Sequence, residues 1–140
     1  MPATTRTALR VGIDIGGTAI KYGVVDTTTG LLAGPMAQLP TPDSPAAVAH
    51  ALQEVAVQIQ QRDAAPLPQS PVGVAFPAII RRGIACSAAN ISDEWLGQDV
   101  NSFLGRAMGL PVHAMNDADA AGWRRRHWVP GRAVTGRCWC

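Results

Sequence analysis

The sequence predicts an α/β fold with a mixed sheet, in which an antiparallel meander is joined to parallel strands and helices. Three observations predict it. Apolar residues alternate with glycine and polar residues in the N-terminal segments, which is the periodicity of strands. Two later segments carry apolar residues three and four positions apart, which is the periodicity of helices. A short apolar run stands before the second helical segment and another after it, so strands and helices alternate in this half of the chain.

The first three strands are expected at residues 11–15, 20–24 and 31–39. A turn of Gly16, Gly17 and Thr18 joins the first two, and a turn at residues 27–30 joins the second to the third. Strands joined by tight turns form an antiparallel meander.

A first helix is expected to begin at Ser44 and Pro45, because serine is a good N-cap and proline suits the first helical position. One face then carries the apolar residues Val48, Leu52, Val55 and Ile59. A second helix is expected over residues 100–108, ended by Gly109 and Pro111.

Two short buried strands are expected at residues 72–76 and 112–115, one before and one after the second helix. The segment that begins at Asn116 is expected to start a third helix. The predicted order is therefore three strands, a helix, a strand, a helix, a strand and a helix.

Composition allows one ordinary domain, since the chain has 140 residues, 47% of them hydrophobic and 16% charged. The formal net charge of +2 argues against a dedicated nucleic-acid binder. Three cysteines give no disulfide framework. The N-terminus has no apolar stretch of signal-peptide length, and no apolar run is long enough for a membrane span. We therefore expect a soluble cytoplasmic protein.

The turn after the first strand has the chemistry of a phosphate site. Glycines expose backbone N–H groups, and such a concavity binds anions. Thr18 adds a hydroxyl donor and Lys21 a positive charge, while Asp14 can hold a magnesium ion through water. The alternative is a plain hairpin turn that needs glycine at positions 16 and 17 only for its geometry.

Asp117 directly follows the last predicted strand. Ligands of α/β sheets gather at the carboxyl ends of strands, and a helix N-terminus keeps a carboxylate ionised. Such a carboxylate can accept a proton from a hydroxyl group during phosphoryl transfer. The alternative is that Asn116, Asp117 and Asp119 are helix caps.

Local sequence context gives an expectation for four other side chains. Asn90 lies between a glycine-containing turn and the second helix, where an amide can bond sugar hydroxyls; the alternative is a turn asparagine. Trp95 is expected to pack in the protein, and Cys86 to be a small core residue. His50 is expected to lie on the solvated side of the first helix.

Four segments, in this order, resemble the motifs of the ROK family of sugar kinases, and within it the bacterial polyphosphate glucokinases. They are residues 13–21 (IDIGGTAIK), 72–80 (VGVAFPAII), 87–95 (SAANISDEW) and 116–122 (NDADAAG). The resemblance covers about residues 9–122. It implies the N-terminal lobe of a two-lobed fold of the actin-like or ribonuclease-H-like kind.

The resemblance also implies residue roles. Asp117 would be the catalytic base on the 6-hydroxyl of glucose or a related hexose, with Asn90, Asn116 and Asp117 contacting the sugar. The first phosphate loop and its Mg²⁺ environment would include Asp14, Gly16, Gly17, Thr18 and Lys21. The phosphoryl donor would be polyphosphate or ATP. Members of the family are often homodimers, and neither nucleic acid nor membrane is an implied partner.

Two departures from the family pattern stand out. Ala78 replaces the glycine that usually follows Phe-Pro, which would tighten the approach of the sugar to the backbone. Residues 123–140 carry five Arg, three of the four Trp and no acidic residue. From the resemblance we expect the family's second phosphate motif and second lobe to be absent from these 140 residues. We interpret this tail as the product of a single-base frameshift near codon 122. The alternative is a genuine Arg/Trp tail that binds nucleic acid or anionic membrane.

The expected organisation is therefore a loose N-terminus at residues 1–8, a phosphate- and sugar-binding lobe at residues 9–122, and an aberrant tail at residues 123–140. The function expected from it is that of a glucokinase-type phosphotransferase, largely inactive in this form. The alternatives are a non-catalytic sugar- or phosphate-binding module and an inert remnant that exposes the apolar face meant for the second lobe.

Overall fold

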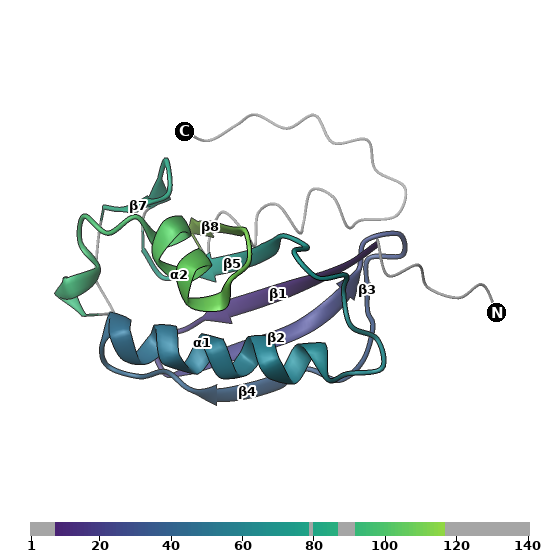
Figure 1. Cartoon of the computed structure of the whole chain (residues 1–140). Helices are drawn as coiled ribbons and strands as arrows, with labels where there is room; N and C mark the ends of the chain where they lie inside the picture. Colours follow the sequence, from purple (N-terminus) through teal and green to yellow (C-terminus); the bar gives the residue numbers. More distant parts are fainter. Residues whose placement is uncertain (1–7, 79, 87–91, 117–140) are drawn as a thin grey trace, which may run out of the picture.

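The computed structural model describes residues 8–78, 80–86 and 92–116 (Figure 1). The chain order is β1 (Leu9–Ile15), β2 (Ala19–Asp26), β3 (Leu31–Leu32), β4 (Ala37–Pro40), α1 (Pro45–Gln60), β5 (Val72–Phe76), β6 (Ile80–Arg81), β7 (Ile84–Ala85), the 3₁₀ turn η2 (Asp93–Trp95), α2 (Val100–Met108) and β8 (Val112–Asn116). The predicted α/β class with a mixed sheet is confirmed.

The main sheet has six strands, in the order β3-β2-β1-β5-β8, with β4 also paired to β2. β1 and β2 are antiparallel, as the meander predicted, whereas β5 is parallel to β1 and β8 is parallel to β5. Parallel strands need crossover connections, and α1 and α2 supply them. The carboxyl ends of β1, β5 and β8 therefore meet at one edge of the sheet.

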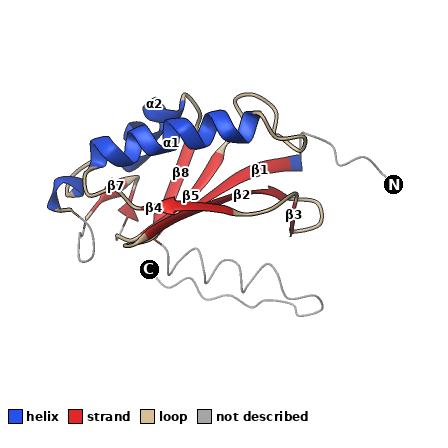
Figure 2. Ribbon diagram, turned by 90° about the horizontal axis from the view of Figure 1, so that it is seen from below, coloured by secondary structure: helices blue, strands red, loops and turns tan. Residues whose placement is uncertain are grey.

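Both helices cover the same face of the sheet (Figure 2). This explains the strand sequences, because every second residue of β1 is buried against the helices. The core includes the fully buried side chains Phe76, Leu52, Ile59 and Leu104. The other face carries Asp14 and three glycines at neighbouring register positions of β2, β1 and β5, namely Gly23, Gly12 and Gly73.

Helix boundaries follow the caps that the sequence contains. Ser44 caps α1, and its Oγ accepts the Ala47 N–H at 3.2 Å. Asp99 caps α2 by accepting the Ser102 N–H at 3.1 Å. Gly109 ends α2 in the left-handed conformation with φ 67°, which suits glycine. The first two predicted helices are confirmed. The third, expected after β8, lies outside the described residues and stays a prediction.

The third predicted strand, at residues 31–39, is wrong as a single element. It is two short strands, β3 pairing with the end of β2 and β4 with its beginning. Gly34 lies between them with φ 137°, a conformation that interrupts a strand, and Pro35 follows it.

The hairpin of β6 and β7 was not predicted, because each of its strands has only two residues. Trp95 is 3% exposed and stacks edge-on against Phe76, with ring centroids 4.8 Å apart, which confirms its packing role. The prediction for Cys86 is wrong, since this side chain is exposed just after β7. His50 is exposed on α1, as expected. Neither described helix, α1 nor α2, is long and apolar enough to cross a membrane.

Candidate functional site at the strand ends

Three parallel strands deliver the candidate site residues to one edge of the sheet. The glycine turn follows β1, Pro77 and Ala78 follow β5, and Asn116 is the last residue of β8. The Asn116 side chain crosses from β8 to the β5 end, where its Nδ2 donates to the Ala78 carbonyl oxygen at 2.7 Å. Two of the three strand ends are thereby tied together, at the place where α/β sheets bind ligands.

The turn that follows β1 is tight. The Gly16 N–H donates to the Ala19 carbonyl at 2.9 Å. A Cβ atom at position 16 would lie 2.8 Å from that same oxygen, closer than real Cβ contacts. Glycine is therefore required at position 16 by a close backbone approach.

Thr41, in the loop between β4 and α1, holds this turn from one side. Its hydroxyl donates to the Gly16 carbonyl oxygen at 2.7 Å, and its backbone N–H donates to the Thr18 carbonyl oxygen at 3.0 Å. Within the described part of the chain, the N–H groups of Gly17 and Thr18 donate to no protein acceptor, and both residues are exposed. The turn thus keeps its N–H donors available for an anion.

Asp14 and Lys21 face each other across β1 and β2 on the sheet face opposite the helices. Both line a hollow of about 300 Å³, whose floor includes Gly12 and Gly73. Among the described residues neither side chain forms an ion pair. A carboxylate and an ammonium group therefore stand side by side, separated from the glycine turn by the Ile15–Ile20 pair.

A profile of the ROK family matches residues 10–132. This chain belongs to the ROK family. The matched range includes β2 to β8 and extends into residues 123–140, the predicted aberrant tail. That boundary stays a prediction.

Two relatives within the ROK family show which kinds of sugar kinase the chain is similar to. It is 35% identical over 138 residues to a polyphosphate glucokinase of Mycobacterium tuberculosis (strain CDC 1551 / Oshkosh), which covers 96% of this chain and 49% of the relative. It is 34% identical over 115 residues to a glucokinase of Streptomyces coelicolor, which covers 82% of this chain and 34% of the relative. The chain spans about half the length of the polyphosphate glucokinase that it matches.

Solved ROK structures share the fold. An inorganic polyphosphate/ATP-glucomannokinase from Arthrobacter sp. strain KM superposes with a TM-score of 0.86 at 44% identity, covering 92% of this chain and 52% of that one. A ROK glucokinase from Streptomyces griseus, solved with glucose and AMPPNP, gives a TM-score of 0.71 at 27% identity, covering 89% of this chain and 38% of that one. The actin-like kinase fold expected from the resemblance is confirmed.

The structure brings together only some of the predicted site residues. Asp14, Lys21, the turn at residues 16–18 and Asn116 lie at or just below one edge of the sheet. Asn90 and Asp117 lie outside the described residues, so their predicted roles stay predictions. Thr41 was missed, because its part depends on a contact between segments 25 residues apart, which periodicity does not reveal.

The residues present suit a water-mediated magnesium ion better than a ligand cage. In the described ranges, no group of three or more His, Cys, Asp or Glu side chains could hold a metal ion. Mg²⁺ commonly keeps several waters and uses one or two carboxylates together with substrate phosphates. Asp14, near a turn with exposed N–H donors, fits that requirement.

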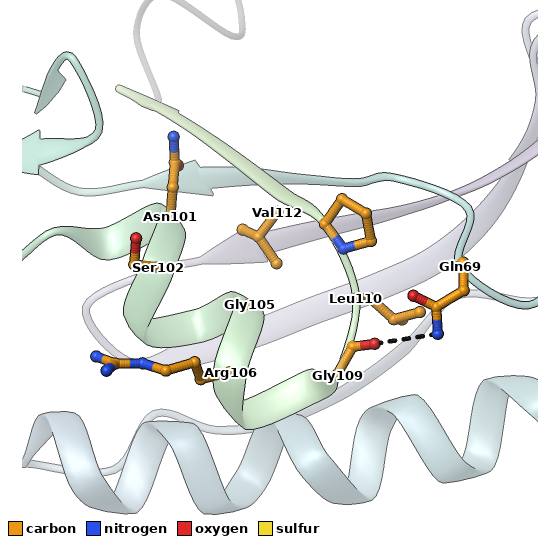
Figure 3. A pocket seen from close by; sticks show the side chains of 9 residues that line it. Gln69, Asn101, Ser102, Gly105, Arg106, Gly109, Leu110 and Val112 are labelled. Carbon is orange, nitrogen blue, oxygen red and sulfur yellow. Dashed lines mark hydrogen bonds between the residues drawn. The ribbon is translucent and has the colours of Figure 1, made fainter.

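A second groove, of about 540 Å³, lies at the opposite end of β8 (Figure 3). It runs between α2 and the start of β8, and at one end of it the Gln69 Nε2 donates to the Gly109 carbonyl oxygen at 3.4 Å. Among the described residues that line it, Arg106 alone is charged. None of the predicted site residues is part of it, so volume alone does not identify the functional site.

The bond between Asn116 and Ala78 predicts a result for Asn116→Asp. A carboxylate cannot donate to the Ala78 carbonyl, and two oxygens would then face each other 2.7 Å apart. We expect the free energy of unfolding to fall by about 1–3 kcal/mol. Urea denaturation measures this, with Asn116→Ala as the control that removes the donor without adding a charge. A smaller loss for the aspartate variant than for the alanine variant would contradict the role given to this bond.

Proposed function

We propose that this chain is the N-terminal lobe of a glucokinase-type phosphotransferase, which moves a terminal phosphoryl group from polyphosphate or ATP to the 6-hydroxyl of glucose. One observation carries the proposal. The turn at residues 16–18, with its exposed N–H groups, and Asn116 at the end of β8 lie at the same edge of the sheet. The names of its relatives support both donor types.

In this proposal each residue has a role of its own. The N–H groups of the turn at residues 16–18 would bind the donor's phosphate oxygens, and Lys21 would add positive charge. Asp14 would hold Mg²⁺ through water, and this ion would neutralise the developing charge on the phosphoryl group. Asn90 and Asn116 would bind the sugar hydroxyls, and Asp117 would accept the proton of the 6-hydroxyl. Homodimer formation and a cytoplasmic location belong to the same proposal.

We further propose that these 140 residues, assayed alone, have little or no kinase activity. A phosphoryl-transfer site has to exclude water and contact the substrates from several sides, and the chain spans about half of its relatives' length. The measurement is the formation of phosphorylated glucose from polyphosphate and from ATP. Turnover that Asp117→Asn abolishes would overturn the proposed inactivity and support the role of Asp117 as the base.

The second candidate is a non-catalytic module that binds sugar or phosphate. The exposed N–H groups of the turn at residues 16–18 favour it, because such groups can bind an anion without any catalytic base. Calorimetry with glucose and with tripolyphosphate separates the two candidates. Binding without turnover supports the module, whereas turnover supports the kinase.

A further inference from the structure

We propose that Thr41 is a positioning residue that fixes the orientation of the Gly16–Gly17 peptide, so that the turn offers an N–H group, not a carbonyl group, to a phosphate. The inference rests on the proposed function, because it concerns how the same turn recognises the donor. It concerns a residue outside the glycine motif.

The bond to Thr41 fixes the direction of the Gly16–Gly17 peptide group. The described residues contain no cis peptide bond, and in a trans peptide the C=O of one residue and the N–H of the next point in opposite directions. The Thr41 hydroxyl holds the Gly16 carbonyl oxygen at 2.7 Å. The N–H of Gly17 is therefore directed away from Thr41.

The Gly16–Gly17 peptide has little steric restraint on its rotation. It is flanked by glycine on both sides, and glycine adopts most backbone conformations at little steric cost. Without a restraint, the peptide can rotate and expose its carbonyl oxygen at the surface. A carbonyl oxygen repels a phosphate, whereas an N–H group binds it, so the orientation of this one group changes the sign of the interaction.

Thr41 restrains the turn at two points. Its own N–H holds the Thr18 carbonyl at 3.0 Å, in addition to the hydroxyl bond to Gly16. Thr41 is half-buried, while Gly17 and Thr18 are exposed. The carbonyl groups of Gly16 and Thr18 are thus bonded to the protein, and the exposed donors are left for the ligand.

The test compares Thr41→Val, which keeps the shape and loses the hydroxyl, with Thr41→Ser, which keeps the hydroxyl. Tripolyphosphate binding to the 140-residue chain is measured by calorimetry with Mg²⁺ present. We expect Thr41→Val to raise the Kd by about tenfold, because the Gly17 N–H is then no longer held toward the charged phosphate oxygen and its hydrogen bond to the ligand is lost. Thr41→Ser should restore the Kd. The amide ¹⁵N shift of Gly17 on titration reports whether this N–H contacts the ligand.

The chain offers a matched control in Thr27. Its hydroxyl and its N–H both donate to the Ala8 carbonyl, at 2.7 and 2.9 Å, at the far end of the β1–β2 hairpin. Thr27→Val removes the same kind of bond from the same hairpin, and it should lower stability without changing the Kd. A purely structural role of Thr41 would likewise lower the unfolding temperature and leave the Kd unchanged.

Each outcome decides between the inference and the function on which it rests. Equal Kd values for the unchanged chain and Thr41→Val would overturn the positioning role and leave the donor site standing. No tripolyphosphate binding by the unchanged chain would overturn both the positioning role and the proposed donor site. If the Kd for tripolyphosphate depends on Thr41 and glucose does not bind, the positioning role is supported and the proposed glucokinase function is not.

Discussion

Replacing Phe76 with alanine is expected to lower the free energy of unfolding by about 3–5 kcal/mol. Phe76 is the last residue of β5 and is 0% exposed, with Trp95 stacked edge-on against its ring. Removing the ring leaves a cavity between the sheet and the segment that carries Trp95. Small domains have a total stability of about 5–15 kcal/mol, so a large share would be lost. Urea denaturation followed by circular dichroism measures the effect.

Phe103 is the matched control, because its ring also stacks edge-on against Trp95, with centroids 5.6 Å apart, but it is only partly buried. Phe103→Ala should cost clearly less than Phe76→Ala. If Phe76→Ala does not fold, Phe76→Leu keeps most of the volume and should cost about 1 kcal/mol. Equal losses at the two phenylalanines would show that the burial difference does not determine their contributions.

The fold was predictable where the sequence carries strong periodic or capping signals. The start of α1 follows from Ser44 and Pro45 and the end of α2 from Gly109, and β5 lies where its short apolar run predicted it. What failed was local and depended on pairing. The split of the third strand reflects a backbone conformation at Gly34 that the alternation of apolar residues does not reveal. The exposure of Cys86 depends on the two-residue strands of the β6–β7 hairpin, which are too short to show a period.

The candidate site was predictable only as far as it is local. The turn at residues 16–18 is predicted by its consecutive glycines. Asn116 is predicted by its position at the end of an apolar strand. Their proximity follows from the parallel pairing of β1, β5 and β8, which the predicted order of elements already implied. The restraint by Thr41 and the contact of Asn116 with Ala78 needed coordinates, because each joins segments at least 25 positions apart.

Gly16→Ala is expected to abolish phosphate binding at the turn of residues 16–18 while leaving most of the sheet folded. The new Cβ atom would lie 2.8 Å from the Ala19 carbonyl oxygen, which is backbone and already accepts the Gly16 N–H. Relief requires the turn to open, and opening it breaks that bond and displaces the carbonyl that Thr41 holds. We expect the free energy of unfolding to fall by about 1–3 kcal/mol. Tripolyphosphate binding should weaken by about a hundredfold or more, which corresponds to ~2.7 kcal/mol.

The control is Gly12→Ala in β1, the strand that leads into the turn, since the described residues leave open space around a Cβ atom at that position. Calorimetry at a temperature where both variants are folded separates affinity from stability. Retained tripolyphosphate affinity in Gly16→Ala would mean that the anion binds elsewhere, and Lys21 with Asp14 at the hollow on the far face of the sheet would become the next place to look. Loss of affinity in Gly16→Ala but not in Gly12→Ala would show that the backbone of the turn binds tripolyphosphate. The effect of Thr41→Val would then follow from the orientation of the Gly16–Gly17 peptide within that turn.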